Sequence, residues 1–261
     1  AKILGSINTL EDINMAIDFK GQEAAISGGL NLNKVAATLK GDANWKNEFK
    51  ADINFDGESL QFSLPPDLTL IVSPHLNAKI KASELKVSGR IEVLEGKLSL
   101  DKLPQGSVSL SKDVIIVNDE GEQIVNDKPF DIFTNVRVVI ADTFNVEGQG
   151  FIGRLGGELQ VSQQANQPLQ LFGSLKIPKG RYSAYSQNLS VTKGTISFNG
   201  IANNPYISIQ ATRSIEDENI IVGIDATGLA NSLHVKLFSK PTMQQSETLS
   251  YLVRGRGLDA E

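Results

Sequence analysis

The stretch that decides the fold is residues 130–140, FDIFTNVRVVI, where one phase of alternate positions is apolar almost throughout. That phase reads Phe130, Ile132, Thr134, Val136, Val138 and Ile140. Successive side chains of a β-strand point to opposite faces of the sheet. The stretch therefore predicts a strand with one apolar and one polar face.

The same alternation recurs at residues 13–19, 49–55, 68–72 and 207–211, and helical spacing is nearly absent. Turn signals separate the segments at Asp56-Gly57, Asn118–Gly121 and Asn199-Gly200. We expect an all-β fold, an elongated curved sheet that forms one repetitive domain over residues 1–261. Strands of about 5 to 9 residues would number roughly 18 to 20, and at about 4.8 Å apart they would extend about 80 to 100 Å.

Glycines recur at an interval of seven residues, as in Gly89 and Gly96 or Gly150 and Gly157. Each unit resembles a strand, a bend that glycine relieves, and a second strand, which favours units stacked in one dimension. The alternative is that Gly-x-apolar is simply common where strands begin.

One segment departs from the strand pattern near the C-terminal end. Ser246 can cap a short helix and Gly255 can end it, with Leu249, Leu252 and Val253 on one side.

Composition limits the classes of function. The net charge of -5 offers no basic face for nucleic acid, and Trp45 is the single tryptophan. The chain has no cysteine, which excludes disulfides and thiolate metal sites. We expect no signal peptide and no helix across a bilayer within these residues, because no apolar run is long enough to span one. We expect it to be a piece of a longer protein.

No catalytic or metal constellation is visible. We expect His234 to face water on the polar phase of its strand and His75 to lie in a loop. The acidic cluster Glu216–Glu218 is interpreted as solvated loop charge, and Asn54–Gly57 lacks the further ligands of a calcium loop. We therefore predict no cofactor, no metal and no enzymatic activity.

A sheet with one apolar side has three uses. It can be a closed β core that serves as a stalk, a transmembrane barrel, or an open curved sheet that receives apolar guests. A membrane barrel ranks last, because most expected strands are short and aromatic residues form only 6% of the chain. The alternation itself does not separate a closed core from an open groove.

The C-terminal third carries a more specific signal. An Asn-Pro strand at residues 204–213 ends in Ala211-Thr212-Arg213, a Ser-x-Pro turn follows at 239–241, and a Ser-Tyr-Leu helix ends at Gly255. In this order the segments resemble the TamB family of the translocation and assembly module, within the AsmA-like group. Residues 200–255 are the most family-specific part.

The resemblance implies a β-taco, an open β-helix-like groove, in the periplasm. It implies an inner-membrane anchor at an N-terminal helix absent here, and contact with a TamA-like outer-membrane barrel through a region beyond this chain. The implied role is to move phospholipid between the membranes and to assist assembly of outer-membrane proteins, including autotransporters.

Alternation and resemblance together predict a groove that binds phospholipid acyl chains. The candidate groove residues are Ile53, Phe55, Ile91, Val93, Leu98, Leu100, Val136, Val138, Ile140, Ile207, Ile209, Ile220, Val222, Ile224, Leu233, Val235 and Leu237. A slip of one residue in register would turn every one of them outward. The alternatives are a scaffold or chaperone that binds nascent outer-membrane strands, and a closed β-helical stalk.

Overall fold

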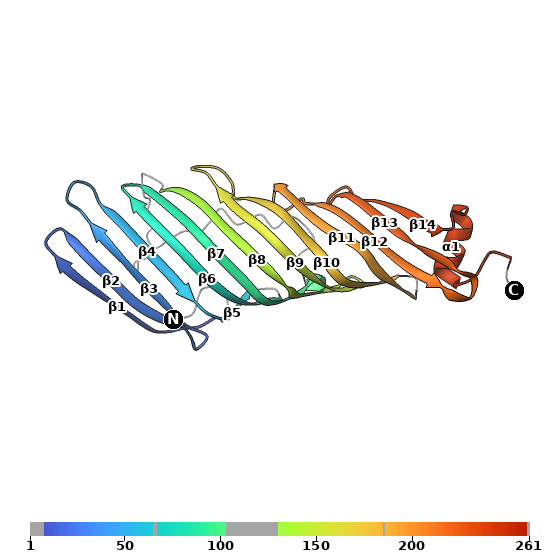
Figure 1. The fold of residues 1–261 in the computed structure, drawn as a ribbon, viewed down its shortest axis with the longest axis horizontal. Helices are drawn as coiled ribbons and strands as arrows, with labels where there is room; N and C mark the ends of the chain where they lie inside the picture. The colour runs from blue at the N-terminus through green and yellow to red at the C-terminus, as the bar shows by residue number, and fades with distance from the viewer. Residues whose placement is uncertain (1–7, 65–66, 103–129, 185, 260–261) are drawn as a thin grey trace, which may run out of the picture.

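The computed structural model describes residues 8–64, 67–102, 130–184 and 186–259. These residues form one open sheet of 14 strands and one short α-helix, which confirms the all-β prediction (Figure 1). The strands follow one another along the long axis of the body, and the helix lies at its C-terminal end.

The strand bounds are β1 Leu10–Lys20, β2 Glu23–Leu32, β3 Val35–Asn44, β4 Lys50–Gly57, β5 Leu60–Leu64, β6 Leu68–Lys81, β7 Glu84–Ser99, β8 Asp131–Gly148, β9 Phe151–Gln163, β10 Gln170–Ala184, β11 Gln187–Gly200, β12 Tyr206–Ile215, β13 Ile220–Leu229 and β14 His234–Lys240. The helices are the 3₁₀ turns η1 Leu100–Lys102 and η2 Glu216–Glu218, and α1 Gln245–Arg254.

Sheet order follows chain order from β1 to β14, except that β5 lies off the path and pairs with β6 alone. Neighbours are antiparallel apart from β7 and β8, which are parallel. Both β4 and β5 pair with β6: β4 pairs with residues 75–81 of that strand, and β5 pairs with residues 68–72.

The expected strand length is wrong, because β6 to β11 are 13 to 18 residues long. The described residues form 14 strands. Gly89 and Gly96 both lie inside β7, whereas Gly150 lies in the turn before β9 and Gly157 lies inside β9. The turn expected at Asn118–Gly121 lies outside the described residues.

Register keeps one face apolar across the whole sheet. Ile91 pairs with Val138, which pairs with Leu159 on the next strand. One position along, the row reads Glu92, Val139 and Glu158. Side chains at paired positions share a face, so the two rows lie on opposite sides. We call the side with Val138 the apolar face and the side with Glu158 the polar face.

Register shifts line up across the strands. They fall between Ile71 and Val72 in β6, at Leu94 in β7 and at residues 141–143 in β8. Further shifts lie at residues 177–178 in β10 and at Thr192 in β11. A bulge bends its strand, so a row of bulges folds the sheet lengthwise into two arms. We call this row the crease.

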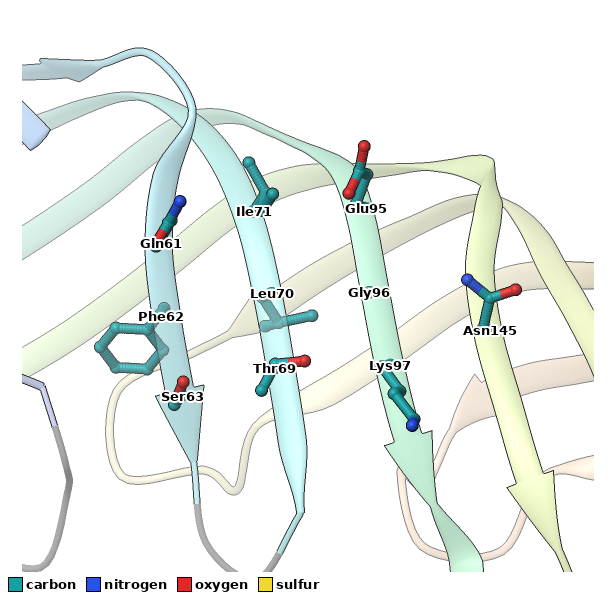
Figure 2. Close-up of a pocket in the computed structure, with 10 residues that line it drawn as sticks. All are labelled: Gln61, Phe62, Ser63, Thr69, Leu70, Ile71, Glu95, Gly96, Lys97 and Asn145. Carbon is teal, nitrogen blue, oxygen red and sulfur yellow. The ribbon is translucent and has the colours of Figure 1, made fainter. Parts of the chain in front are cut away.

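Glycines lie on the apolar face beside the crease. Gly96 of β7 lies between Leu70 of β6 and the part of β8 that carries Asn145 (Figure 2). Phe144 of β8 packs so closely over Gly96 that a Cβ there would lie 2.2 Å from its ring. Ile177, which is only 7% exposed, packs in the same way over Gly194. At both places a large apolar side chain therefore lies over a glycine of the neighbouring strand, close to the crease.

Near the N-terminal end the fold brings separate strands into contact. Leu32 of β2, Ala37 of β3 and Leu60 of β5 form a buried cluster, although β5 pairs with neither of the other two strands. Asn8 holds this corner by bonding to both the amide and the carbonyl of Ser63. Here β5 packs over β2 and β3, and the apolar face lies between them.

The helix is present, but two details differ from expectation. It ends as predicted at Gly255, which has left-handed backbone geometry, yet Gln244 and not Ser246 occupies the N-cap position, without a side-chain cap. The buried side of α1 carries Tyr251 and Leu252, whereas Leu249 is 45% exposed. Contact with the sheet decides which side of the helix is buried, and that contact is not encoded in the helical segment alone.

Candidate functional site

The middle of the apolar face is the candidate site. Val93, Val136 and Leu159 are less than 9% exposed, while Ile91 and Val138 beside them are half-buried. In the part of the chain that the structure describes, contacting buried residues form two clusters, one near each end of the body. The apolar side chains of β7 to β10 lie between these clusters.

The strand register shows on which face of the sheet each predicted groove residue lies. All of them except Leu100 and Leu233 lie in strands and in the phase of the apolar face. Leu100 begins η1 and Leu233 precedes β14. Whether a guest uses these positions stays a prediction.

The residue-by-residue prediction missed several members of this face. Leu159 and Leu175 complete the rows that begin at Val138 and Ile140. The signal was available, because each lies two residues from a glycine in the predicted repeat and shares its phase. Pro74, which pairs with Ile91, also lies on the apolar face inside β6, where a loop was expected.

At the N-terminal edge the apolar face is openly exposed. Along β1, Ile13, Met15, Ile17 and Phe19 are 59%, 60%, 45% and 70% exposed. Phe19 meets Trp45 edge to face, with ring centroids 6.0 Å apart. In the described sheet β1 pairs only with β2, so its outer edge also carries backbone groups without strand partners.

At the C-terminal end α1 covers the apolar face. Tyr251 and Leu252 form a buried cluster with Leu189, Ala211 and Val222, which come from β11, β12 and β13. Val222 is fully buried. The predicted groove residue Val222 therefore lies in one cluster with residues of the chain's own helix. The predicted groove residues Ile220, Ile224 and Leu237 pack against the same cluster.

Polar contacts hold α1 in place. The Tyr251 hydroxyl donates to the Glu218 carboxylate in η2, and this hydrogen bond raises the pKa of Tyr251 to about 12. Gln187 donates from Nε2 to the Val253 carbonyl at 3.1 Å and accepts a hydrogen bond from the Arg213 guanidinium. Side chains of β11 and β12 are thereby connected to the end of the helix.

The polar face carries paired charges. Arg137 bonds to Glu158 at 2.5 Å, and this pairing lowers the pKa of Glu158. His75 lies 2.9 Å from Asp56, which raises the pKa of the imidazole. The expectation that His75 lies in a loop is wrong, because it is part of β6 and pairs with Arg90. On its other side Pro74 lies between the part of β6 that pairs with β4 and the part that pairs with β5, so the proline interrupts neither pairing.

Within the described ranges, histidine, aspartate and glutamate side chains do not gather into a group that could hold a metal ion. None of the described helices is long and apolar enough to cross a membrane.

Comparison with known proteins gives a matching family and a similar protein. The family described as the TamB C-terminal domain matches residues 14–261. The translocation and assembly module subunit TamB of Haemophilus influenzae is 29% identical over 266 residues. The match covers 96% of this chain and 20% of that protein, so the chain spans about a fifth of its relative's length.

Proposed function

The chain belongs to the TamB C-terminal domain family, and on that premise we propose that its apolar face binds phospholipid acyl chains and lets them move along the body. The observation that carries the proposal is the continuity of the apolar face: the register preserves it from β1 to β14, even across the crease. A face that served only to pack a local core would not need to keep its phase over that length.

The physical chemistry of such a face suits a sliding guest. Removing apolar surface from water contributes about 0.8 kcal/mol per methylene, so an acyl chain gains several kcal/mol by lying on Ile, Leu, Val and Phe side chains. The interaction is non-directional, and no specific polar contact has to break when the guest shifts. Movement along the face therefore needs no cofactor.

The relative's name makes it a subunit of a translocation and assembly module. We extend that role to this chain and place it in the periplasm, as part of a conduit between the inner and outer membranes. A TamA-like outer-membrane barrel would be its partner, and assembly of outer-membrane proteins would depend on the lipid supplied. The chain would act without catalysis.

The test is lipid copurification. The protein is purified from cells in mild detergent, and bound lipid is extracted and identified by mass spectrometry. We expect phospholipid in the wild-type sample and much less after Ile140→Glu, which puts a charge on the apolar face. Asn135→Glu on the polar face is the control and should retain the lipid. Lipid-free wild-type protein, or equal lipid in both variants, would contradict the proposal.

A scaffold for outer-membrane proteins is the second candidate, and the exposed row on β1 favours it. A client strand could add to this edge through backbone hydrogen bonds while its apolar side chains contact Met15 and Phe19. The same purification distinguishes the two functions, because a scaffold would retain client polypeptide and lose it after Met15→Lys. Lipid binding in the middle of the face should not respond to that change.

A further inference from the structure

We propose that α1 is a movable stopper, and that the section of the apolar face beneath it is a second acyl-binding site, occupied by the helix until the helix leaves. This inference rests on the proposed function, because it concerns where the acyl path ends. Two observations support it. The apolar face continues under α1, and α1 is held there by apolar contacts and by hydrogen bonds to Glu218 and Gln187.

The covered section is continuous with the open one. Val191 of β11 pairs with Ala211, which pairs with Ile224 and then Leu237 on the following strands. This row belongs to the same face as Ile207 and Ile209 farther along β12. It has the apolar lining of the middle section, and what distinguishes it is that Tyr251 and Leu252 lie against it.

The helix fills this section as a guest would. Tyr251 and Leu252 are 7% and 3% exposed, whereas Leu249 is 45% exposed. Tyr251 and Leu252 are the large apolar side chains among the buried residues of α1, which also include Thr248 and Ser250. An acyl chain offers apolar surface of the same kind, and either occupant would keep Val222 and Ile224 from water.

The helix is also poorly stabilised on its own. It has ten residues, and its N-terminus lacks a side-chain cap. Isolated helices of this length are marginal in water, so α1 depends on its contact with the sheet. Its polar contacts, Tyr251 to Glu218 and Gln187 to Val253, are single hydrogen bonds.

The test loosens the helix and asks whether lipid follows. Tyr251→Phe keeps the ring and removes the hydrogen bond to Glu218. Leu249→Ala alters the exposed side of the same helix and is the matched control. Leu252→Ser, which removes the most buried apolar contact of α1, is the stronger variant. Amide hydrogen exchange reports opening of α1, and a palmitic acid that carries a diazirine labels acyl-binding residues, which peptide mass spectrometry maps.

In the wild type we expect labels on β7 to β10 and none on β13 beneath α1. Tyr251→Phe should speed exchange of the α1 amides about tenfold or more, the usual effect of losing a hydrogen bond to a charged group. Leu252→Ser should speed it by at least about thirtyfold. Labels should then extend to Val222 and Ile224 in both variants, while Leu249→Ala should match the wild type.

Any one of four results would overturn the inference. The wild type could already carry labels at Ile224, α1 could open without any new label there, or Leu252→Ser could leave α1 exchange unchanged or unfold β13 and β14 together with the helix. Absence of labels from β7 to β10 in every protein would instead refute the proposed function. The two failures are therefore distinguishable.

Discussion

The proposal that the apolar face binds acyl chains predicts opposite outcomes for the same substitution at two adjacent residues. Val138 lies on the apolar face between Ile91 and Leu159. Val139 lies on the polar face between Glu92 and Glu158. Both side chains are half-buried. Lysine at position 138 introduces a charge where a guest would lie, whereas lysine at position 139 meets two carboxylates and leaves the apolar face unchanged.

The magnitude follows from the length of acyl chain displaced. If the ammonium group and its water keep about three or four methylenes off the face, binding loses about 3 kcal/mol. That free energy corresponds to a roughly hundredfold weaker Kd. The folding cost stays near about 1 kcal/mol, because a lysine stem can lie along apolar surface while its charge reaches water.

The assay is fluorescence titration with a phosphatidylcholine that carries a fluorophore on one acyl chain, since its zwitterionic headgroup is not attracted to a single lysine. Val138→Lys should weaken binding roughly a hundredfold, and Val139→Lys should bind like the wild type. The reasoning is refuted if both variants lose affinity equally, or if Val138→Lys binds normally while both remain folded.

Three further predictions concern the fold around the face. Leu189→Ala should cost about 2 to 5 kcal/mol and lower the urea midpoint, because Leu189 is 1% exposed in the cluster beneath α1. Gly96→Ala should cost about 1 to 3 kcal/mol and lower the Tm, since its Cβ would lie 2.2 Å from the Phe144 ring. The Tyr251 pKa is raised from 10.0 to about 12. The stabilisation from its hydrogen bond to Glu218 is therefore complete below pH 10 and decreases as pH rises toward 12. The difference in urea midpoint between the wild type and Tyr251→Phe should shrink over that range.

Each of these has a contradicting result. Normal stability of Leu189→Ala would mean that α1 does not bury this residue in solution. An unchanged Tm for Gly96→Ala would mean that the Phe144 ring does not pack over Gly96 beside the crease. A constant difference between the wild type and Tyr251→Phe from pH 10 to 12 would mean that the Tyr251 hydroxyl has no anionic acceptor.

The phase of the strands could be predicted from sequence, because period-two alternation depends only on local side-chain geometry. Val136, Val138 and Ile140 share a face in the structure as their spacing indicates. The apolar face also continues across the crease, although the positions that carry it change there. In β7 the apolar face passes from odd positions such as Val93 to even positions such as Leu98, and the bulge at Leu94 accounts for the change.

Strand length and connectivity could not be predicted in the same way. A glycine inside a strand and a glycine between two strands have similar local sequence, and only pairing with neighbours separates them. Gly157 shows why: it has φ +147, and a Cβ there would lie 2.5 Å from the Ser174 carbonyl oxygen of the next strand. That close approach exists only once β9 and β10 are paired. The parallel pairing of β7 with β8 likewise depends on tertiary structure.

The position of α1 is the other feature that sequence left open. The helical segment offers Leu249, Tyr251, Leu252 and Val253, and apolarity alone does not select the side that faces the sheet. The hydrogen bond between Tyr251 and Glu218 and the cluster around Val222 make that selection. Glu218 lies in η2 and Val222 in β13, so the sequence of the helical segment itself does not include these partners.

The most direct test of the central claim is a cysteine scan along β8. The chain has no native cysteine, so a label at each single position from 134 to 140 is unique. A phospholipid with a spin label on its acyl chain is added, and quenching of a fluorophore at each position is measured. Lipid on the apolar face predicts strong quenching at 136, 138 and 140 and weak quenching at 135, 137 and 139. Equal quenching at all positions, or none at any, would contradict the account.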